Sequence, residues 1–538
     1  MVKKKTYLAL LPLTLCFSSV SVLAATTADL EKRLEQQEKQ IKRLENRLKG
    51  TRAAVKENRS RISDAADRLK INGFFSGGAA QMDSPTMELS LYGIEDNYTT
   101  DSVSKMGVQF TFEVSDSIDA TAQLVSKGVN DYNVEAEWAY LSWEATSDLT
   151  VRIGRQRIPY YLLSEYLDVG YAYPWVRPPI ELYNIPLSST DGLGLLYDFS
   201  LGDWNFSVQG YAGQSSGFTD QLEADFILNQ AWGTSLFAEH GAWTFRVGYN
   251  RSHLDVGDVP IGGKGYLLAA ATDGYNDFSQ SLENGTTGNA ALDPLAGLFT
   301  GLGRQVPTVN NMTDDTNVKT EYQSAAFMYD DGNLLVMGEI ANLRIEDLSA
   351  PAGDGGYLTV GYRFGKWMPH VTFAKYYTDK ESDDNVRSQL EGSLGLQQGV
   401  FDAVYAQTLI GTGNPAVAQA TAQGTVDSVV AGLASQGLVL QEFQEAWTTL
   451  IQQQQSYTLG IVYDVSPRVK AKLEATHYED FGKSEIESTS YTGNPAAPTN
   501  ATPTIAREIY GTGRFSADPV GSGKKHTAIY SFSIDAVF

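Results

Sequence analysis

The sequence predicts an all-β transmembrane antiparallel barrel of about sixteen strands, preceded by an α-helical coiled coil. Three observations support this prediction. Apolar residues recur at period two from residue 71 to the end of the chain, short turns alternate with long loops between the strands, and a heptad repeat precedes them. A soluble β-sandwich would not sort its loops into short and long by turn, so the barrel is favoured over that alternative.

Residues 1–24 have the composition of a signal peptide. Lysines at 3–5 precede an apolar stretch at 7–17, and a Val-Leu-Ala sequence ends at Ala24. The apolar stretch is too short for a membrane-spanning helix, so we expect cleavage after Ala24. Cys16 is the only cysteine and would leave with this segment. The mature chain would then have no thiol catalysis, no disulfide and no cysteine metal site.

Residues 25–70 are predicted to form a periplasmic coiled coil. Aliphatic residues recur every seventh position, while the second core position is half polar. An isolated helix with such a stripe would be poorly stable, so we expect several copies of the chain to associate; a single surface helix is the alternative. The residues expected at this contact are Leu34, Ile41, Leu48, Val55, Asn58, Ile62 and Leu69.

Residues 71–538 are predicted to form the barrel. Because the strand number is even, the first and the last strand should both have their free chain terminus on the periplasmic side. Short turns occur at sites such as Ser466-Pro467. The largest connections are expected at the opposite end, near 252–318, 379–455 and 481–525. The second of these carries apolar residues at helical spacing, namely Val426, Val429, Val430 and Leu433.

The last strand ends on an aromatic residue. Tyr530, Phe532, Ile534 and Phe538 share one face at period two, and polar residues occupy the other face. In a barrel the apolar face would meet lipid while the strand closes the sheet against the first strand. The ending also resembles the C-terminal signal by which the Gram-negative barrel assembly machinery recognises its substrates.

The sequence contains no convincing catalytic or metal-binding motif. The five histidines are scattered, and no H-E-x-x-H sequence occurs. Glycine-rich pieces such as Gly192-Leu-Gly194 lack the rest of a phosphate-binding pattern. We therefore expect no enzyme activity, no cofactor, no metal and no nucleic-acid partner.

The connection near 158–190 is predicted to fold into the barrel lumen as a constriction. It is rich in aromatic and proline residues, including Tyr160, Trp175 and Tyr183, which a freely solvated loop would not favour. A loop inside the barrel must have its backbone groups satisfied, which a water-containing lumen permits. A loop packed on the rim or at a subunit contact is the alternative.

Basic residues are expected to line the pore. Alternation places Arg246, Arg363, Lys470 and Lys472 on lumen-facing positions, whereas a bulge at Gly154 would decide the direction of its neighbours. One hypothesis is a basic strip opposite a loop of mixed charge, which would admit small anionic or zwitterionic solutes. The alternative is that these residues are solvated or paired with wall carboxylates. The pore candidates are Arg152, Arg155, Arg157, Asp168, Arg177, Glu181, Arg246, Arg363, Lys470 and Lys472.

This architecture resembles the DcaP-like trimeric porins of Gram-negative bacteria. The resemblance rests on the heptad from Leu30 to Leu69, the Gly154-Arg155-Gln156 strand end with its aromatic loop, and the terminal Phe538. It implies an outer-membrane homotrimer for passive diffusion of small hydrophilic, often anionic, solutes. Membrane lipid, lipopolysaccharide and the assembly machinery are the expected partners. A second resemblance is to barrels with an N-terminal coiled coil proposed for siderophore uptake.

Two other functional classes are consistent with the sequence. An envelope tether would use the basic coiled coil to hold a periplasmic partner while the barrel stays closed. A surface receptor or adhesin would bind its partner through the long outer loops, again with a closed barrel.

Overall fold

The structure, a computed structural model, consists of two units, Met1–Arg68 and Leu69–Phe538. Apart from shorter pieces, it describes residues 68–89, 92–185, 187–219, 224–256, 317–346, 352–380, 399–435, 453–479 and 526–538. The predicted signal peptide lies outside the described residues, as do the predicted heptad positions from Leu34 to Ile62. The few described residues between Lys32 and Thr51 are helical, and Lys39 pairs with Glu35 one turn earlier at 2.7 Å.

One heptad assignment is wrong. Leu69, expected at a coiled-coil contact, is the first residue of strand β1, so the barrel begins two residues earlier than predicted. The reason is that Leu69, Ile71 and Phe75 continue the outward-facing alternation of the strand, and all three side chains are exposed on that face.

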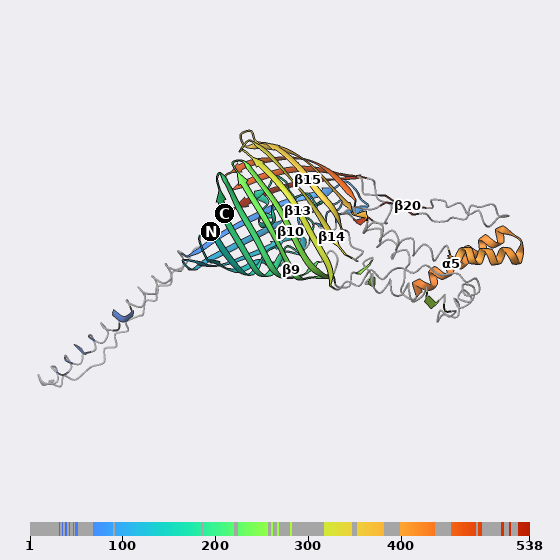
Figure 1. The fold of residues 1–538 in the computed structure, drawn as a ribbon, viewed down its shortest axis with the longest axis horizontal. Helices are drawn as coiled ribbons and strands as arrows, with labels where there is room; N and C mark the ends of the chain where they lie inside the picture. Colours follow the sequence, from blue (N-terminus) through green and yellow to red (C-terminus); the bar gives the residue numbers. More distant parts are fainter. Residues whose placement is uncertain are drawn as a thin grey trace, which may run out of the picture. The chain divides into compact units, whose positions relative to one another are not determined.

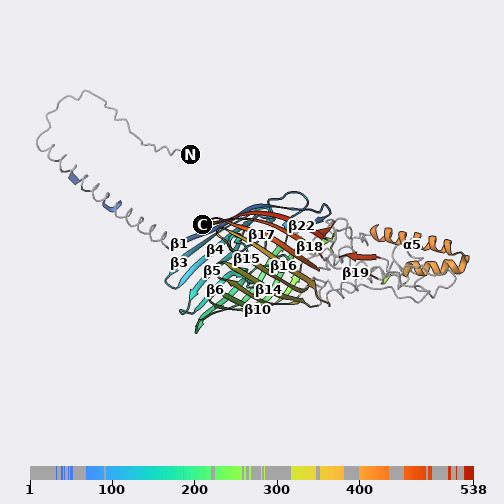
Figure 2. The ribbon, with the colours of Figure 1, turned by 90° about the horizontal axis from the view of Figure 1, so that it is seen from above.

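Sixteen strands form one closed sheet in which all neighbours are antiparallel, as predicted (Figures 1 and 2). The sheet closes where β1 pairs with β22. Within the described parts of the chain, three further two-stranded sheets are separate from the barrel sheet. The barrel strands are β1 Leu69–Met82, β3 Lys105–Ser115, β4 Ile118–Lys127, β5 Val134–Glu144, β6 Leu149–Arg157, β7 Ser189–Leu201, β8 Trp204–Thr219, β9 Ala224–His240, β10 Trp243–Val256, β13 Val318–Asp330, β14 Leu334–Ile345, β15 Gly353–Tyr362, β16 Trp367–Thr378, β17 Gln454–Ser466, β18 Val469–Glu479 and β22 His526–Val537. The two-stranded sheets pair β11 Pro260–Ile261 with β12 Tyr266–Leu267, β19 Lys483–Ile486 with β20 Arg507–Tyr510, and β2 Met87–Glu88 with β21 Ser516–Ala517.

The two ends of the barrel differ in their connections. Turns of two to four residues join the strands at one end, for example Asp116-Ser117 between β3 and β4. The connections after β6, β10, β16 and β18 are far longer and all leave from the other end. This arrangement confirms the predicted sorting of short turns and long loops except after β8, where only residues 220–223 precede β9. We call the two ends the short-turn end and the long-loop end.

Helix α5, Pro415–Ser435, contains the four residues that the helical spacing singled out in the connection after β16. It begins behind Asn414, whose side-chain oxygen accepts hydrogen bonds from the amides of Ala416 at 3.0 Å and Val417 at 3.3 Å. Among the described residues, no helix is long and apolar enough to cross a membrane.

The outer face of the barrel is apolar and the inner face is polar. Ile340, Leu459 and Leu473 point outward and are each at least 60% exposed, whereas Glu339, Lys472 and Glu474 next to them point inward and are buried. Aromatic side chains such as Trp204, Trp243 and Trp367 gather near the short turns. An exposed apolar band with an aromatic border suits a bilayer, where charge on the lipid-facing side is costly.

A charge placed on the outer band should destabilise the barrel strongly. Leu358 lies in the middle of β15 and faces outward, so Leu358→Arg should cost about 2–4 kcal/mol of unfolding free energy in lipid vesicles. Ser207→Arg on β8 is the control because Ser207 lines the lumen. Equal unfolding free energies for the two variants in a urea titration would contradict the assigned faces.

Candidate functional site

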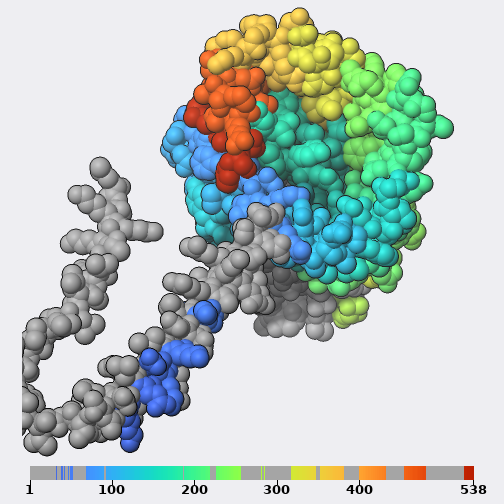
Figure 3. All heavy atoms as spheres, turned by 90° about the vertical axis from the view of Figure 1, so that its left-hand side faces the viewer, coloured from blue at the N-terminus to red at the C-terminus, as the bar shows by residue number. Residues whose placement is uncertain are grey.

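Residues 158–188, the connection after β6, fold inside the barrel; we call this segment the inner loop. It contains two short 3-10 turns, η3 Ser164–Tyr166 and η4 Gly170–Ala172. Trp175 is 1% exposed and Ile180 is 2% exposed, although neither belongs to regular secondary structure. Figure 3 looks onto one end of the barrel, where teal atoms, the colour of this part of the sequence, lie inside the hollow. The segment that was predicted to enter the lumen therefore lies inside the barrel, and its role as a constriction stays a prediction.

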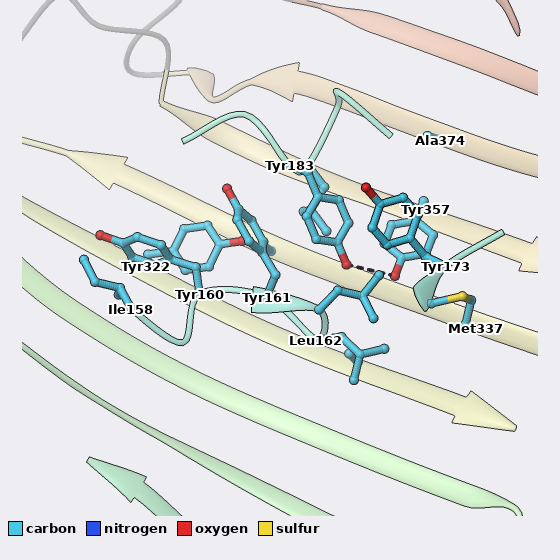
Figure 4. Close-up of a cluster of buried hydrophobic side chains, with 14 of the residues drawn as sticks. Ile158, Tyr160, Tyr161, Leu162, Tyr173, Tyr183, Tyr322, Met337, Tyr357 and Ala374 are labelled. Atoms are coloured by element: carbon cyan, nitrogen blue, oxygen red, sulfur yellow. Dashed lines mark hydrogen bonds between the residues drawn. The ribbon is translucent and has the colours of Figure 1, made fainter. Parts of the chain in front are cut away.

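Tyrosines pack the first part of the inner loop against the wall (Figure 4). Tyr160 meets Tyr322 of β13 edge to face, with ring centroids 5.1 Å apart. Tyr161 lies 4.5 Å from Tyr183, and the hydroxyl of Tyr183 is 3.2 Å from that of Tyr357 on β15. Aromatic pairs of this kind add about 0.5–1.5 kcal/mol each beyond the area that they bury. The cluster therefore fixes the loop along the wall formed by β13 to β15.

Asp168 anchors the middle of the inner loop to the opposite wall. Its carboxylate accepts a hydrogen bond from Arg157 at the end of β6 and lies 3.1 Å from the ammonium group of Lys127 on β4. Glu137 of β5 completes the cluster, 2.7 Å from Lys127 and 3.6 Å from Arg157. We call these four residues the Asp168 cluster. Because it joins three strands to the loop and three of its four side chains are less than 10% exposed, breaking it should be costly.

Three lysines, Lys105, Lys470 and Lys472, hold the loop backbone beside the Asp168 cluster. Lys472 of β18 donates to the carbonyls of Gly170 at 2.5 Å and Trp175 at 2.7 Å, and it pairs with Asp535 of β22 at 3.0 Å. Lys470 donates to Tyr171 O at 3.0 Å, and Lys105 of β3 lies 3.4 Å from Leu167 O. These ammonium groups donate to carbonyls of the inner loop; Leu167 O also accepts from the Tyr173 hydroxyl at 3.1 Å.

Two inward-facing carboxylates of the wall accept hydrogen bonds from groups of the inner loop. Glu339 of β14 accepts hydrogen bonds from the Leu162 amide at 2.9 Å and the Tyr183 hydroxyl at 2.8 Å. Glu474 of β18 accepts from the Val176 amide at 3.0 Å. Hydrogen bonds to charged groups contribute about 1.5–3 kcal/mol each. Carboxylates of β14 and β18 thus hold the inner loop in addition to the lysines described above.

Burial alone would raise the pKa of the Asp168 carboxyl, but the positive charges of Lys127, Arg157 and Lys105 outweigh that effect. The pKa of folded Asp168 is consequently far below its ordinary value of 3.8. The carboxylate therefore contributes its full stabilisation above pH 3.8 and loses it as the pH falls further.

Acid should loosen the inner loop. Current fluctuations through the barrel should grow as the pH falls from about 4 to about 2, because a released Asp168 carboxyl takes up protons in this range whereas the paired carboxyl does not, so acid favours the released loop. The readout is current noise in a planar bilayer at fixed voltage. Asp168→Asn should be noisy already at neutral pH and should respond much less to acid. A wild-type protein that stays quiet down to pH 2 would contradict this role of Asp168.

Several predicted pore residues serve as buried anchors. Arg246 is 1% exposed and donates to Pro159 O and to the Ser324 hydroxyl behind the inner loop. Arg177 donates to the Ser531 hydroxyl at 2.8 Å, and Glu181 accepts from Gln454 at 2.8 Å. These three side chains point into the lumen, but the inner loop or the wall covers them. The same is true of Arg157, Asp168 and Lys472.

Two predicted pore residues lie elsewhere. Arg155 binds Asp191 of β7 through two hydrogen bonds of 2.9 and 2.8 Å. Asp191 lies on the outer face with Leu193, so the side chain of Arg155, which pairs with Asp191, also points outward and not into the lumen. Gly154, with φ of 129°, lies between Arg155 and the inward-facing Arg152. Arg363 pairs with Asp330 in the turns of the short-turn end at 2.6 Å and does not reach the constriction.

Arg152 is the predicted basic residue that meets the open lumen most directly. Its side chain is about one quarter exposed, lies over the ring of Tyr140 at 5.0 Å and approaches Glu165 of the inner loop at 3.7 Å. Lys470 is half-buried beside Tyr171, 4.2 Å from the ring centroid.

A cavity of about 760 Å³ remains between the inner loop and the wall formed by β7 to β10. Inner-loop residues Pro159 to Tyr166 form one side, and Ser207, Gln209 and Thr244 lie on the other. Four carboxylates line it: Asp148, Glu165, Asp198 and Glu239. No lysine or arginine is among the described residues that line this cavity. The charged side chains that line this cavity are therefore all acidic.

A second loop also folds inward. In the connection between β1 and β3, Leu89 and Ile94 are fully buried and pack with Val176 and Ile180 of the inner loop. The guanidinium of Arg177 lies 5.5 Å from the ring of Tyr92 in the same connection. The inner loop is thus covered from the long-loop end along β18, β22 and β1.

Sequence analysis missed several residues of this site. Lys105, Lys127, Glu137, Glu339 and Asp535 anchor the loop, and Asp198 and Glu239 acidify the cavity. For Glu339 the signal was present, because Val336 and Ile340 face lipid and residue 339 must then point inward. Glu137 had no such signal, because it lies at an irregularity in the pairing of β4 with β5.

No group of three or more His, Cys, Asp or Glu side chains in the described part of the chain could hold a metal ion. No family model and no curated protein matches the sequence. Among solved structures, the chain is similar to the outer membrane channel DcaP of Acinetobacter baumannii, with 8% identity over 87% of this chain and 97% of that chain and a TM-score of 0.41. An anion-selective porin from Comamonas acidovorans has 10% identity over 87% and 99% of the two chains and a TM-score of 0.41. OprB of Pseudomonas putida has 10% identity over 89% and 96% and a TM-score of 0.42. At such identities and scores, the fold assignment rests on the strand pairing described above and not on these similarities.

Proposed function

We propose that this protein is an outer-membrane porin of a Gram-negative bacterium, a passive channel for small hydrophilic solutes. The observation that carries the proposal is the folded inner loop, which narrows the lumen of a sixteen-stranded barrel but leaves a polar cavity of about 760 Å³ beside β7 to β10. Barrels of this strand number have room for water inside. A barrel that only tethered or displayed loops would need no such polar space.

Entry of uncharged sugars into vesicles tests the channel directly. Vesicles containing the purified protein should swell in monosaccharides, more slowly in disaccharides and hardly at all in larger oligosaccharides, because the inner loop limits the width. Removal of residues 25–68 should leave these rates unchanged, since the route lies within the barrel. Swelling no faster than that of protein-free vesicles would contradict a porin and favour a closed-barrel tether or receptor.

We further propose that the channel favours cations. The sequence-based expectation of an anionic solute depended on basic residues that the inner loop now covers, such as Arg246 and Lys472. The cavity that remains carries carboxylates, which raise the local concentration of cations and repel anions. Neutral and zwitterionic solutes would pass without a large electrostatic penalty.

We also propose that the protein works as a homotrimer with the coiled coil in the periplasm. The proposal rests on the heptad and on the outer apolar band, which would partly be covered in such an assembly. Native mass spectrometry of the detergent-solubilised full chain should give three copies, and removal of residues 25–68 should weaken the complex. A monomer at all concentrations would contradict this assembly.

A further inference from the structure

The seam between β1 and β22 joins strands from opposite ends of the barrel sequence. Nine residue pairs run from Phe74 opposite Val537 to Met82 opposite Ile529. Beyond them, Gly73 and Phe538 exchange two backbone hydrogen bonds, each of 2.9 Å. β1 and β22 are far apart in the sequence, so their pairing closes the longest loop of all strand pairs in the barrel. No turn connects these two strands, so no turn fixes which residues pair.

The residues of β1 in the middle of the seam do little to specify which residue pairs with which. Ser76, Gly77, Gly78, Ala79 and Ala80 follow one another, and none has a large side chain. A slip by one residue would turn every apolar side chain from lipid to lumen and is strongly disfavoured. A slip by two residues keeps each side chain on its own face, so polarity does not exclude it.

Phe538 has a large side chain whose position depends on the pairing register of β1 with β22. Its ring lies over Gly73 so closely that a Cβ on residue 73 would overlap the ring. On the other side of β1, the ring of Phe74 lies in the same way over Gly107 of β3. Aromatic rings that cover strand glycines are a known means of pinning register. A slip by two would move Phe538 away from Gly73 and place it opposite a residue with a side chain.

We infer that Phe538 and Gly73 form a register pin that selects the native pairing of β1 with β22. The pin acts through the folded chain itself and does not depend on the proposed channel function. It gives the terminal aromatic residue a role inside the finished barrel, in addition to any role in recognition by the assembly machinery.

Disulfide pairs report the register because the only native cysteine is Cys16. Ala80 pairs with Ser531 in the native seam, so Ala80→Cys with Ser531→Cys detects that register. Ala80→Cys with Ser533→Cys detects a slip by two. Both pairs are placed in the otherwise native chain, in Gly73→Ala, in Phe538→Ala and in their combination. Each protein is refolded into phosphatidylcholine vesicles without assembly machinery.

The native background should cross-link only in the first pair. Gly73→Ala and Phe538→Ala should each raise cross-linking of the slipped pair several-fold, and the combination should add nothing, because both changes break one contact. Phe538→Tyr keeps the ring and should restore the native register. Gly210→Ala is the matched control, since the nearest atom to its Cβ is 3.9 Å away.

Two outcomes would overturn the pin. One is cross-linking of the native pair alone in every variant whose barrel closes. Closure is measured by the heat-sensitive mobility of the barrel on gels. The other is an effect of Phe538→Ala that occurs only in cells, with normal refolding in vesicles, because the terminal ring would then serve only as an assembly signal.

Discussion

Asp168→Asn should release the inner loop from the wall and make the barrel current noisy at neutral pH. The substitution removes the carboxylate that Arg157 and Lys127 share and leaves the buried Arg157 and the partly exposed Lys127 with one fewer partner each. Breaking a buried ion pair in this way costs about 3–5 kcal/mol. We expect a loss of that order in unfolding free energy in lipid vesicles, together with frequent current steps between open levels.

Asp191→Asn is the matched control. It makes the same chemical change in a carboxylate that is paired with an arginine, but the Arg155–Asp191 pair is about 38% and 51% exposed and lies on the outer face. Exposed pairs contribute about 0–1 kcal/mol, so the current should stay quiet. Equal effects of the two substitutions would mean that the Asp168 cluster does not hold the loop.

Neutralising the cavity should remove the preference for cations. Glu165→Gln, Asp198→Asn and Glu239→Gln together take three negative charges from the lining and change the shape of the side chains little. Because fixed charge in a narrow, low-dielectric passage sets the local ion concentration, the reversal potential should shift most of the way to zero. Uncharged sugars should enter vesicles at the wild-type rate.

The control for this variant removes equal charge from the outer face. Asp191→Asn, Glu321→Gln and Glu479→Gln alter carboxylates on β7, β13 and β18 whose neighbours in alternation face outward. The reversal potential should remain that of the wild type. If the outer and inner variants shift it equally, the net charge of the protein and not the cavity sets selectivity.

Sequence reasoning was strong wherever the physics is local. Strand faces follow from the pleat, so Phe532 and Ile534 were correctly assigned to the outer face and Arg246 and Lys472 to the inner face. The sorting of the loops follows from the antiparallel connections. The inner loop was recognised because its tyrosines, tryptophan and prolines need burial, and helix α5 because its valines recur at helical spacing.

Sequence reasoning failed where partners are far apart in the chain. Nothing local indicates that the Leu162 amide meets Glu339 or that the Val176 amide meets Glu474. When the path of the inner loop is not known, an inward-facing arginine can be interpreted either as a charge that lines the pore or as a residue that binds the inner loop. Arg155 was uncertain for a different reason, since the backbone at Gly154, with φ of 129°, decides its direction.

The central claim is that solutes pass through an acidic space beside a fixed inner loop. The most direct test is the reversal potential of single channels of the full-length mature protein in a planar bilayer under a tenfold potassium chloride gradient. The account expects discrete openings and a reversal potential of the sign that cation flow produces. A reversal potential of the opposite sign, or no openings from correctly folded protein, would contradict it.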